Sequence, residues 1–232
     1  MYKSCEICGA DNWDLVVYEG AVRSGSFGTQ TEGGKVLRCG GCRVDRLDEE
    51  VSIASASYES DEYRTAMDQG LEVEDFFNQS DPGQIYNLSA VWPLNLRDKV
   101  LADIGCGAGS FLSHVSGLAK HIVAIEPTKR YHSSLRKSGY AVFSYVTDAL
   151  KKYQEGVDIA FAFQVIEHVQ NPREFLTEIS ALLKPGGHLI IATPNRDDIL
   201  LKLLPEEFSP FYYRIAHRWY FDRGSLCQCV EL

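Results

Sequence analysis

Beyond residue 99 the chain alternates between short apolar runs and amphipathic stretches, a pattern typical of β–α–β units. Turn residues flank five of the apolar runs, and their lack of polar alternation predicts strands that are buried on both faces of a parallel sheet. We expect these strands at 100–104, 122–125, 141–146, 159–163 and 188–192. The alternation therefore predicts an α/β fold.

Helices are predicted between these strands. The clearest covers 171–184, where Asn171 can cap the first turn, Pro172 suits the first helical position and the Pro-Gly-Gly of 185–187 ends the helix. A second helix follows Gly109. It should turn one apolar face inward, made of Phe111, Leu112, Val115 and Leu118.

The first predicted strand runs into a glycine-rich turn that opens a helix. Gly105, Gly107 and Gly109 let the backbone turn tightly and approach a ligand, while the helix N-terminus offers free N–H groups. In a parallel sheet this turn lies at the carboxyl edge, where ligands bind. Glu126, at the end of the second strand, can accept hydrogen bonds from both hydroxyls of a ribose.

The glycine spacing differs from that of a dinucleotide-binding loop. That loop follows G-x-G-x-x-G/A, whereas the glycines here follow G-x-G-x-G and Ser110 stands at the last position of the longer pattern. Asp103, just before the turn, would repel a pyrophosphate but suits a ligand with an ammonium or sulfonium charge. These features point to S-adenosylmethionine.

With these motifs, the chain from about 99 to 195 resembles the class I S-adenosylmethionine-dependent methyltransferases. The matching segments are Asp103-Ile104-Gly105-Cys106-Gly107-Ala108-Gly109, Glu126-Pro127, Asp148-Ala149, Gln164-Val165-Ile166-Glu167-His168-Val169 and Lys184-Pro185-Gly186-Gly187-His188. The resemblance implies a Rossmann-like, doubly wound parallel sheet with strand order 3-2-1-4-5.

The same resemblance implies which residues hold the cofactor. The glycine turn would hold the methionine part, Glu126 the ribose, and Asp148 with Ala149 the adenine, while Gln164 would line the other side. The full predicted set of cofactor-binding residues is Asp103, Gly105, Gly107, Gly109, Glu126, Pro127, Asp148, Ala149 and Gln164.

The tail resembles the branch of these enzymes that acts on sugars, lipopolysaccharide precursors and other small metabolites. The Thr-Pro-Asn of 193–195 leads into an aromatic-rich insert over 196–224 that contains His217-Arg218-Trp219-Tyr220-Phe221. In the family, two more strands usually follow a helix like the one expected over 225–232. We expect this terminal hairpin to be absent here, so that a second copy of the chain could cover the exposed sheet edge.

Four cysteines form two Cys-x-x-Cys pairs before residue 43. Cys5 pairs with Cys8 and Cys39 with Cys42, and glycines stand beside both pairs. Each pair can present two thiolates to one tetrahedral ion, so the spacing predicts a zinc ribbon with a structural zinc. An iron–sulfur cluster and four unrelated buried thiols are the alternatives. The remaining cysteines are interpreted as small apolar residues: Cys106, Cys227 and Cys229.

The expected organisation has three parts. A zinc-ribbon-like domain covers 1–50, an acidic helical lead-in or lid covers 51–98, and a methyltransferase domain covers 99–232 with its helical aromatic insert over 196–224. Within the lead-in, Tyr63 and Arg64 are the expected lid contacts.

Composition and charge exclude some classes of function. The chain is 45% hydrophobic and 24% charged, as in ordinary globular proteins. Its 23 Lys and Arg against 32 Asp and Glu give a net charge of -9, which argues against a partner held by phosphate contacts. The apolar runs are far shorter than the roughly 20 residues of a membrane span, and no apolar leader follows Met1. We expect a cytoplasmic protein without a membrane span or a nucleic-acid partner.

The leading hypothesis is methyl transfer to an oxygen, nitrogen or carbon of a small molecule such as a sugar or glycan precursor. A hydroxyl acceptor must lose a proton, and histidine is the side chain best matched to that task near neutral pH. His168 follows the fourth strand and His217 lies in the aromatic insert, so we predict that one of them is the general base.

Two other functions stay open. Some ribosomal-RNA methyltransferases also carry an N-terminal zinc ribbon, although the first 60 residues here hold only six basic residues against ten acidic ones. A non-catalytic scaffold that binds the cofactor is the other alternative.

Overall fold

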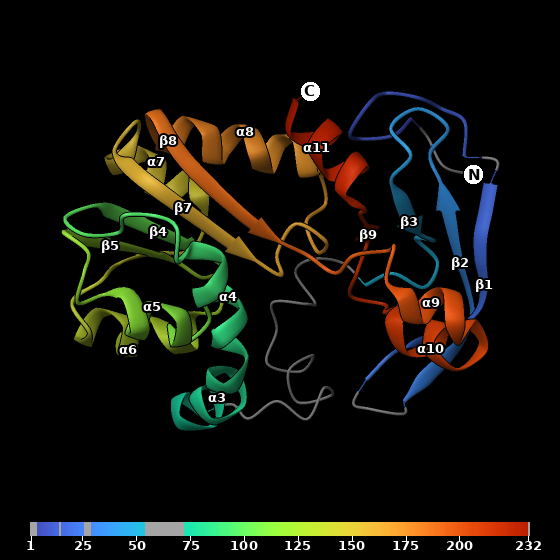
Figure 1. Cartoon of the computed structure of the whole chain (residues 1–232), viewed down its shortest axis with the longest axis horizontal. Coiled ribbons are helices and arrows are strands. Elements are labelled where there is room, and N and C mark those ends of the chain that lie inside the picture. Colours follow the sequence, from blue (N-terminus) through green and yellow to red (C-terminus); the bar gives the residue numbers. More distant parts are fainter. Residues whose placement is uncertain (1–3, 14, 26–28, 54–71, 232) are drawn as a thin grey trace. The chain divides into compact units, whose positions relative to one another are not determined.

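The computed structural model describes residues 4–13, 15–25, 29–53 and 72–231, and these residues form two compact units (Figure 1). The parallel unit comprises the described residues of 69–165 together with 177–192. The antiparallel unit comprises the described residues of 1–68 together with 166–176 and 193–232. The predicted lid contacts Tyr63 and Arg64 lie outside the described residues.

The parallel unit is built on a five-stranded sheet in which every pair of neighbours is parallel. Its strands are β4 (Val100–Ile104), β5 (His121–Ile125), β6 (Ala141–Phe143), β7 (Val157–Phe163) and β8 (Leu183–Ala192). They lie in the order β6-β5-β4-β7-β8. This confirms the predicted order 3-2-1-4-5, because β4 is the first strand of this sheet along the chain.

Four strand boundaries differ from the prediction. β5 begins at His121 and β7 at Val157, one and two residues earlier than expected. β6 ends at Phe143, because Val146 already begins α7 (Val146–Tyr153). β8 begins at Leu183, so the Pro-Gly-Gly of 185–187 lies inside a strand instead of ending the helix. Leu183 pairs with Val157, and the register then shifts before the next pair. Proline and glycine are tolerated there because a strand irregularity frees their backbone groups from the regular ladder.

Helices cover both faces of this sheet. Figure 1 shows α5 (Ser110–Val115) and α6 (His132–Lys137) on one face, and α7 and α8 (Pro172–Leu182) on the other. A short 3-10 helix, η2 (Lys129–Tyr131), leads into α6. The predicted cap of α8 is confirmed, since the Asn171 side-chain oxygen accepts from the backbone N–H groups of Arg173 at 3.1 Å and Glu174 at 3.3 Å.

The described part of the acidic lead-in is helical, as predicted. It forms α3 (Val73–Ser80), η1 (Asp81–Gly83) and α4 (Gln84–Val91). Phe76 and Phe77 of α3 pack against the main core of the parallel unit, which includes Leu101, Leu112 and Phe161. Residues 72–98 of the lead-in are therefore part of this unit, whereas 51–53 belong to the antiparallel unit.

The antiparallel unit contains β1 (Leu15–Arg23), β2 (Gln30–Arg38), β3 (Asp45–Leu47) and β9 (Trp219–Tyr220) in that order. All three strand pairings are antiparallel. The tail adds α9 (Ile199–Leu203), α10 (Pro205–Tyr212) and α11 (Arg223–Glu231). Val22, Val36, Leu47, Tyr212, Tyr213 and Tyr220 form its buried tyrosine-rich core.

The sequence assigned 99–232 to one domain, whereas the structure groups 193–232 with the N-terminal strands. The physical reason is the pairing of β9 with β3, together with the packing of Tyr212 and Tyr220 beside Val36. The insert is helical up to Tyr212, as predicted, but its Trp219 and Tyr220 form a strand. No helix in the described ranges has the length and apolar character needed to cross a membrane.

One inward-facing residue was predicted wrongly. α5 ends at Val115, so Leu118 lies in the turn that follows and is 38% exposed, while Leu112 is fully buried. We expect Leu112→Ala to lower the free energy of unfolding by about 2–5 kcal/mol, and Leu118→Ala by less than about 1 kcal/mol. Chemical denaturation of both variants measures this difference. Equal losses would contradict the described end of α5.

Candidate cofactor and metal sites

The glycine turn follows β4 at the carboxyl edge of the parallel sheet. Gly105, Gly107 and Gly109 all have left-handed φ angles, of 73°, 56° and 93°. A Cβ on Gly107 would lie 2.2 Å from the ring of Phe76, and one on Gly105 would lie 2.6 Å from the side chain of Val165. Only glycine satisfies both the backbone angle and the close packing at these two positions.

Glu126 ties this turn to the end of β5. Its carboxylate is 3% exposed and accepts two backbone hydrogen bonds, from Gly107 N–H at 2.8 Å and from Thr128 N–H at 2.8 Å. Both carboxylate oxygens are thus held by backbone donors, and a carboxylate can accept up to about four hydrogen bonds. The backbone therefore already orients Glu126, the residue predicted to bind the ribose.

Asp103 places a second carboxyl group close to Glu126. It is 3% exposed, and burial together with the neighbouring Glu126 raises the pKa of Asp103 well above its usual range. Two buried carboxyl groups so close together favour a positively charged ligand, since such a ligand would compensate both. This fits the sulfonium and ammonium groups of S-adenosylmethionine.

The remaining predicted cofactor residues lie at neighbouring strand ends. Asp148 stands in the first turn of α7 and pairs with Lys151 at 2.9 Å, and Ala149 beside it is buried. A cavity of about 450 Å³ reaches Asp148, and it is lined also by Lys129, His132, Arg136, Val142, Phe143 and Ser144. Pro127 follows Glu126 directly. The structure thus brings Asp148 to a cavity at the end of β6.

Gln164 ends β7 in a strained conformation. Its φ is 58°, and its backbone N–H donates to the carbonyl of Ala192 at 2.7 Å. Its side chain is exposed. A left-handed residue other than glycine, asparagine or aspartate is uncommon and marks a turn that its surroundings hold in place.

Sequence reasoning missed two residues of the lead-in that touch the glycine turn. Phe76 covers Gly107, and Asp81 accepts a hydrogen bond from the Ser110 hydroxyl at 2.6 Å. Neither residue belongs to a motif, and nothing in the local pattern points to them. The acidic character of the lead-in was the only available signal.

The structure brings the four predicted metal ligands together. Cys5 Sγ lies 3.7 Å from Cys42 Sγ, Cys8 Sγ lies 3.6 Å from Cys39 Sγ, and all four sulfurs lie within 4.8 Å of one another. A tetrahedral zinc with Zn–S bonds of about 2.3 Å needs sulfurs about 3.8 Å apart. The donor set and spacing therefore fit one structural zinc.

Two backbone knuckles of the same shape hold these sulfurs. In the first, Cys5 N–H donates to the carbonyl five residues on at 2.6 Å, and Gly9 N–H donates to the Cys5 carbonyl at 2.8 Å. The second repeats this with Cys39 at 2.9 Å and Arg43 at 3.1 Å. Gly9 and Arg43 both have left-handed φ angles, of 77° and 61°. The sequence indicated the role of Gly9 but not that of Arg43.

Hydrogen bonding between the sulfurs also changes the pKa values of the cysteines. A hydrogen bond from Cys42 lowers the pKa of Cys5 to about 5, while the same hydrogen bond and burial raise the pKa of Cys42. This hydrogen bond favours the thiolate form of Cys5, the form that binds metal. Of the other cysteines, Cys106 and Cys229 are buried as predicted, whereas Cys227 is exposed and does not act as an apolar core residue.

The two predicted catalytic histidines lie side by side in the antiparallel unit. Their ring centroids are 4.8 Å apart, and His168 Nδ1 donates to the carbonyl of Ala216 at 2.8 Å. Glu167 next to them accepts from the Thr193 hydroxyl at 3.0 Å, and Arg214 donates towards His217 Nε2 at 3.3 Å. Glu167, His168 and His217 offer three ligand atoms within 4.8 Å. The Arg214 charge disfavours a cation there.

Burial disfavours the charged form of both histidine rings. It lowers the pKa of His168 to about 4, and burial, His168 and Arg23 together hold the pKa of His217 well below its usual range. Both rings are therefore neutral at pH 7. A general base works best when its pKa is near the operating pH, so these shifts disfavour that role. The assignment of a general base stays a prediction.

The comparisons with known proteins agree with this geometry. The model of a family described as a methyltransferase domain matches residues 85–232. The chain belongs to this family. A solved structure of a SAM-dependent methyltransferase from Thermotoga maritima, a possible histamine N-methyltransferase, is 26% identical with a TM-score of 0.53. The match covers 68% of this chain and 73% of that one.

Curated relatives include two ubiquinone biosynthesis O-methyltransferases. The one from Bradyrhizobium sp. (strain ORS 278) is 30% identical over 102 residues, which is 42% of this chain and 40% of the relative. The one from Cereibacter sphaeroides (strain KD131 / KCTC 12085) is 32% identical over 113 residues, 45% of each chain. The chain thus spans about half the length of the curated relatives it matches. Family and fold confirm the predicted class I S-adenosylmethionine-dependent methyltransferase.

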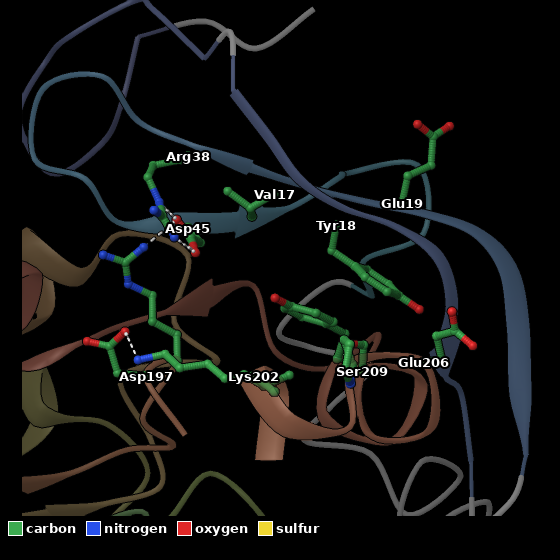
Figure 2. Close-up of a pocket in the computed structure, with 13 residues that line it drawn as sticks. Val17, Tyr18, Glu19, Arg38, Asp45, Asp197, Lys202, Glu206 and Ser209 are labelled. Atoms are coloured by element: carbon green, nitrogen blue, oxygen red, sulfur yellow. Dashed lines mark hydrogen bonds and ion pairs between the residues drawn. The ribbon is translucent and has the colours of Figure 1, made fainter. Parts of the chain in front are cut away.

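The antiparallel unit contains a larger cavity of about 810 Å³. Figure 2 shows Arg38 and Asp45 on one side with the Asp197–Lys202 pair below them, while Tyr18, Ser209 and Glu206 lie farther to the right. Tyr18 stacks on Tyr213 with ring centroids 4.5 Å apart. The other lining residues are Val17, Glu19, Arg196, Leu201 and Pro205. No sequence pattern indicated this cavity, because its lining comes from strands and helices distant along the chain.

Proposed function

We propose that the protein transfers a methyl group from S-adenosylmethionine to a small-molecule acceptor. One observation carries the proposal: the buried Asp103 and Glu126 carboxyl groups beside a glycine turn that only glycine can form. S-adenosylmethionine supplies a methyl group on a positively charged sulfur. The two carboxyl groups would compensate its charge, and Glu126 would orient the ribose through hydrogen bonds.

The residues of the parallel unit would act by binding and positioning. Methyl transfer needs the acceptor atom in line with the sulfur–methyl bond, so a fixed cofactor removes much of the entropic barrier. Glu126 is itself fixed by Gly107 and Thr128, and Phe76 packs over the turn. A preorganised turn of this kind loses little freedom when the cofactor binds.

For the acceptor we propose a hydroxyl group of a sugar or a glycan or lipopolysaccharide precursor. The names of the curated O-methyltransferase relatives support an oxygen acceptor. The cavity of Figure 2 supports a polyhydroxylated ligand, since its Arg38–Asp45 and Lys202–Asp197 pairs offer donors and acceptors beside tyrosine rings. The tail resemblance to sugar-modifying methyltransferases points the same way.

For the four cysteines we propose one structural zinc in a ribbon-like fold. All four ligand positions are filled by protein, so no position is left for a reacting water. A cytoplasmic location is part of this proposal, because an odd number of seven cysteines suits metal ligands and buried thiols better than a disulfide framework.

The cofactor assignment is tested at Glu126. We expect Glu126→Ala to weaken S-adenosylmethionine binding by about ten- to a hundredfold, because a charged acceptor is lost. Isothermal titration calorimetry measures the affinity, with the exposed Glu155→Ala as the matched control. Thermal melting of the free protein shows how much of the effect comes from a loosened turn. Equal affinity of Glu126→Ala and wild type would refute the ribose assignment.

The acceptor proposal is tested with a panel of nucleotide sugars and catechol-type phenols, with S-adenosylhomocysteine formation as readout. We expect turnover with a sugar, and Lys202→Ala should raise the KM for that sugar by about tenfold, since a charged hydrogen bond is lost. The Lys202–Asp197 pair is exposed, so folding should be unaffected. Turnover with phenols alone would exclude the sugar but keep methyl transfer. Cofactor binding without any turnover would favour the scaffold.

The zinc proposal predicts one zinc per chain in protein purified without chelator. Cys39→Ser should lose the zinc and unfold the knuckles, because metal binding and folding are coupled in such sites. The exposed Cys227→Ser is the matched control and should keep the metal. Elemental analysis together with the thiolate absorption of the cobalt-substituted protein gives the count. Full zinc content in Cys39→Ser would show that the ligand assignment is wrong.

A further inference from the structure

A buried arginine network connects the first metal knuckle to the C-terminal tail. Glu6 stands inside the knuckle, and it accepts from Arg46 Nη1 at 2.8 Å and from Arg218 Nη2 at 3.3 Å. Glu49 accepts from the same two arginines, at 2.7 Å in the case of Arg218. The Arg46 side chain is only 2% exposed. Two carboxylates and two guanidinium groups therefore form one cluster.

Aromatic rings fix the buried arginine from the other side. The Arg46 guanidinium carbon lies 5.1 Å from the ring centre of Trp219 and 6.0 Å from that of Trp13. Trp219 is fully buried, and its indole N–H donates to the carbonyl of Val169 at 2.8 Å. A charged group that is buried, paired and stacked in this way has one arrangement, because any other leaves an unpaired charge.

Backbone hydrogen bonds connect the tail to the Glu167–His168 motif. The N–H groups of Arg218 and Trp219 both donate to the carbonyl of Glu167, at 2.8 Å and 3.2 Å. His168 Nδ1 in turn donates to the carbonyl of Ala216. Hydrogen bonds thus join segment 216–219 to segment 167–169. The side chain of Arg218 connects these two segments to Glu6.

We propose that Glu6 and Arg218 couple the four-cysteine cluster to the Glu167–His168 motif, so that metal in the cluster fixes the position of that motif. Arg218 is a positioning residue, since it acts through the Glu167 backbone and not on a substrate. The coupling rests on the zinc proposal, because Glu6 lies between Cys5 and Cys8 and takes its position from their knuckle. It does not depend on the cofactor or the acceptor.

The test compares zinc-loaded and chelator-treated full-length protein. Amide hydrogen exchange is followed at Arg218 and Trp219, and the ring signals of His168 and His217 are followed by NMR. In wild type, zinc removal should speed exchange at both amides by about two- to thirtyfold and shift both histidine signals, as expected for coupling along a contact network. In zinc-loaded Arg218→Ala the same changes should already be present, and zinc removal should add little to them.

Three further variants separate coupling from general destabilisation. Glu6→Gln keeps the shape of the knuckle and should reproduce the Arg218→Ala changes while the zinc stays bound. Arg218→Lys keeps the charge and should restore part of the wild-type signals. As a control, Lys35→Gln breaks the Lys35–Glu19 pair in the same unit and should change neither the amide exchange nor the histidine signals.

The outcomes are distinct. A purified chain without metal overturns both the zinc proposal and the coupling. A zinc-loaded chain whose amides and histidines do not respond to zinc removal overturns the coupling alone. Equal, additive effects of zinc removal in wild type and in Arg218→Ala would also overturn it, because independent sites behave in that way. If Arg218→Ala does not fold, Glu6→Gln and the wild-type comparison decide.

Discussion

The carboxylate of Glu126 holds two turns of the parallel unit in place. One of its oxygens accepts from Gly107 in the glycine turn and the other from Thr128 beyond β5. Buried backbone N–H groups need a partner, and here a side chain provides it for two of them at once. The positions of Gly105, Phe76 and Asp103 around this turn all depend on that carboxylate.

The same turn brings two buried carboxyl groups close together. Asp103 and Glu126 are both buried, and the charge of Glu126 contributes to the raised pKa of Asp103. Folding therefore concentrates negative potential at the carboxyl edge of β4 and β5. Such a potential suits the positively charged sulfur of the cofactor that we propose for this edge.

Much of the parallel unit could be predicted from the sequence, because each local signal agrees with the global fold. Val100–Ile104 is apolar except for Asp103 and ends at a glycine turn, and the strand has those bounds. The errors came where tertiary pairing overrides local signals. The Pro-Gly-Gly of 185–187 looks like a helix stop, yet pairing of Leu183 with Val157 extends β8 through it.

The antiparallel unit was harder to predict for the same reason. The short pairing of Trp219 and Tyr220 with β3 joins residues that are more than 170 positions apart, and the local sequence shows only aromatic residues. The cluster of Cys5, Cys8, Cys39 and Cys42 could be predicted, since its spacing carries the geometry. The network around Arg46 could not, because a buried arginine has the same local signature as an exposed one.

The two knuckles are equal in shape but unequal in intrinsic cost. Both need a left-handed residue at the same step, and the first has Gly9 there while the second has Arg43. A side chain in that conformation costs about 1–2 kcal/mol, which glycine avoids. For the proposed zinc, the Cys5–Cys8 half is therefore the better prepared one, and closing the Cys39–Cys42 half would use part of the metal-binding energy.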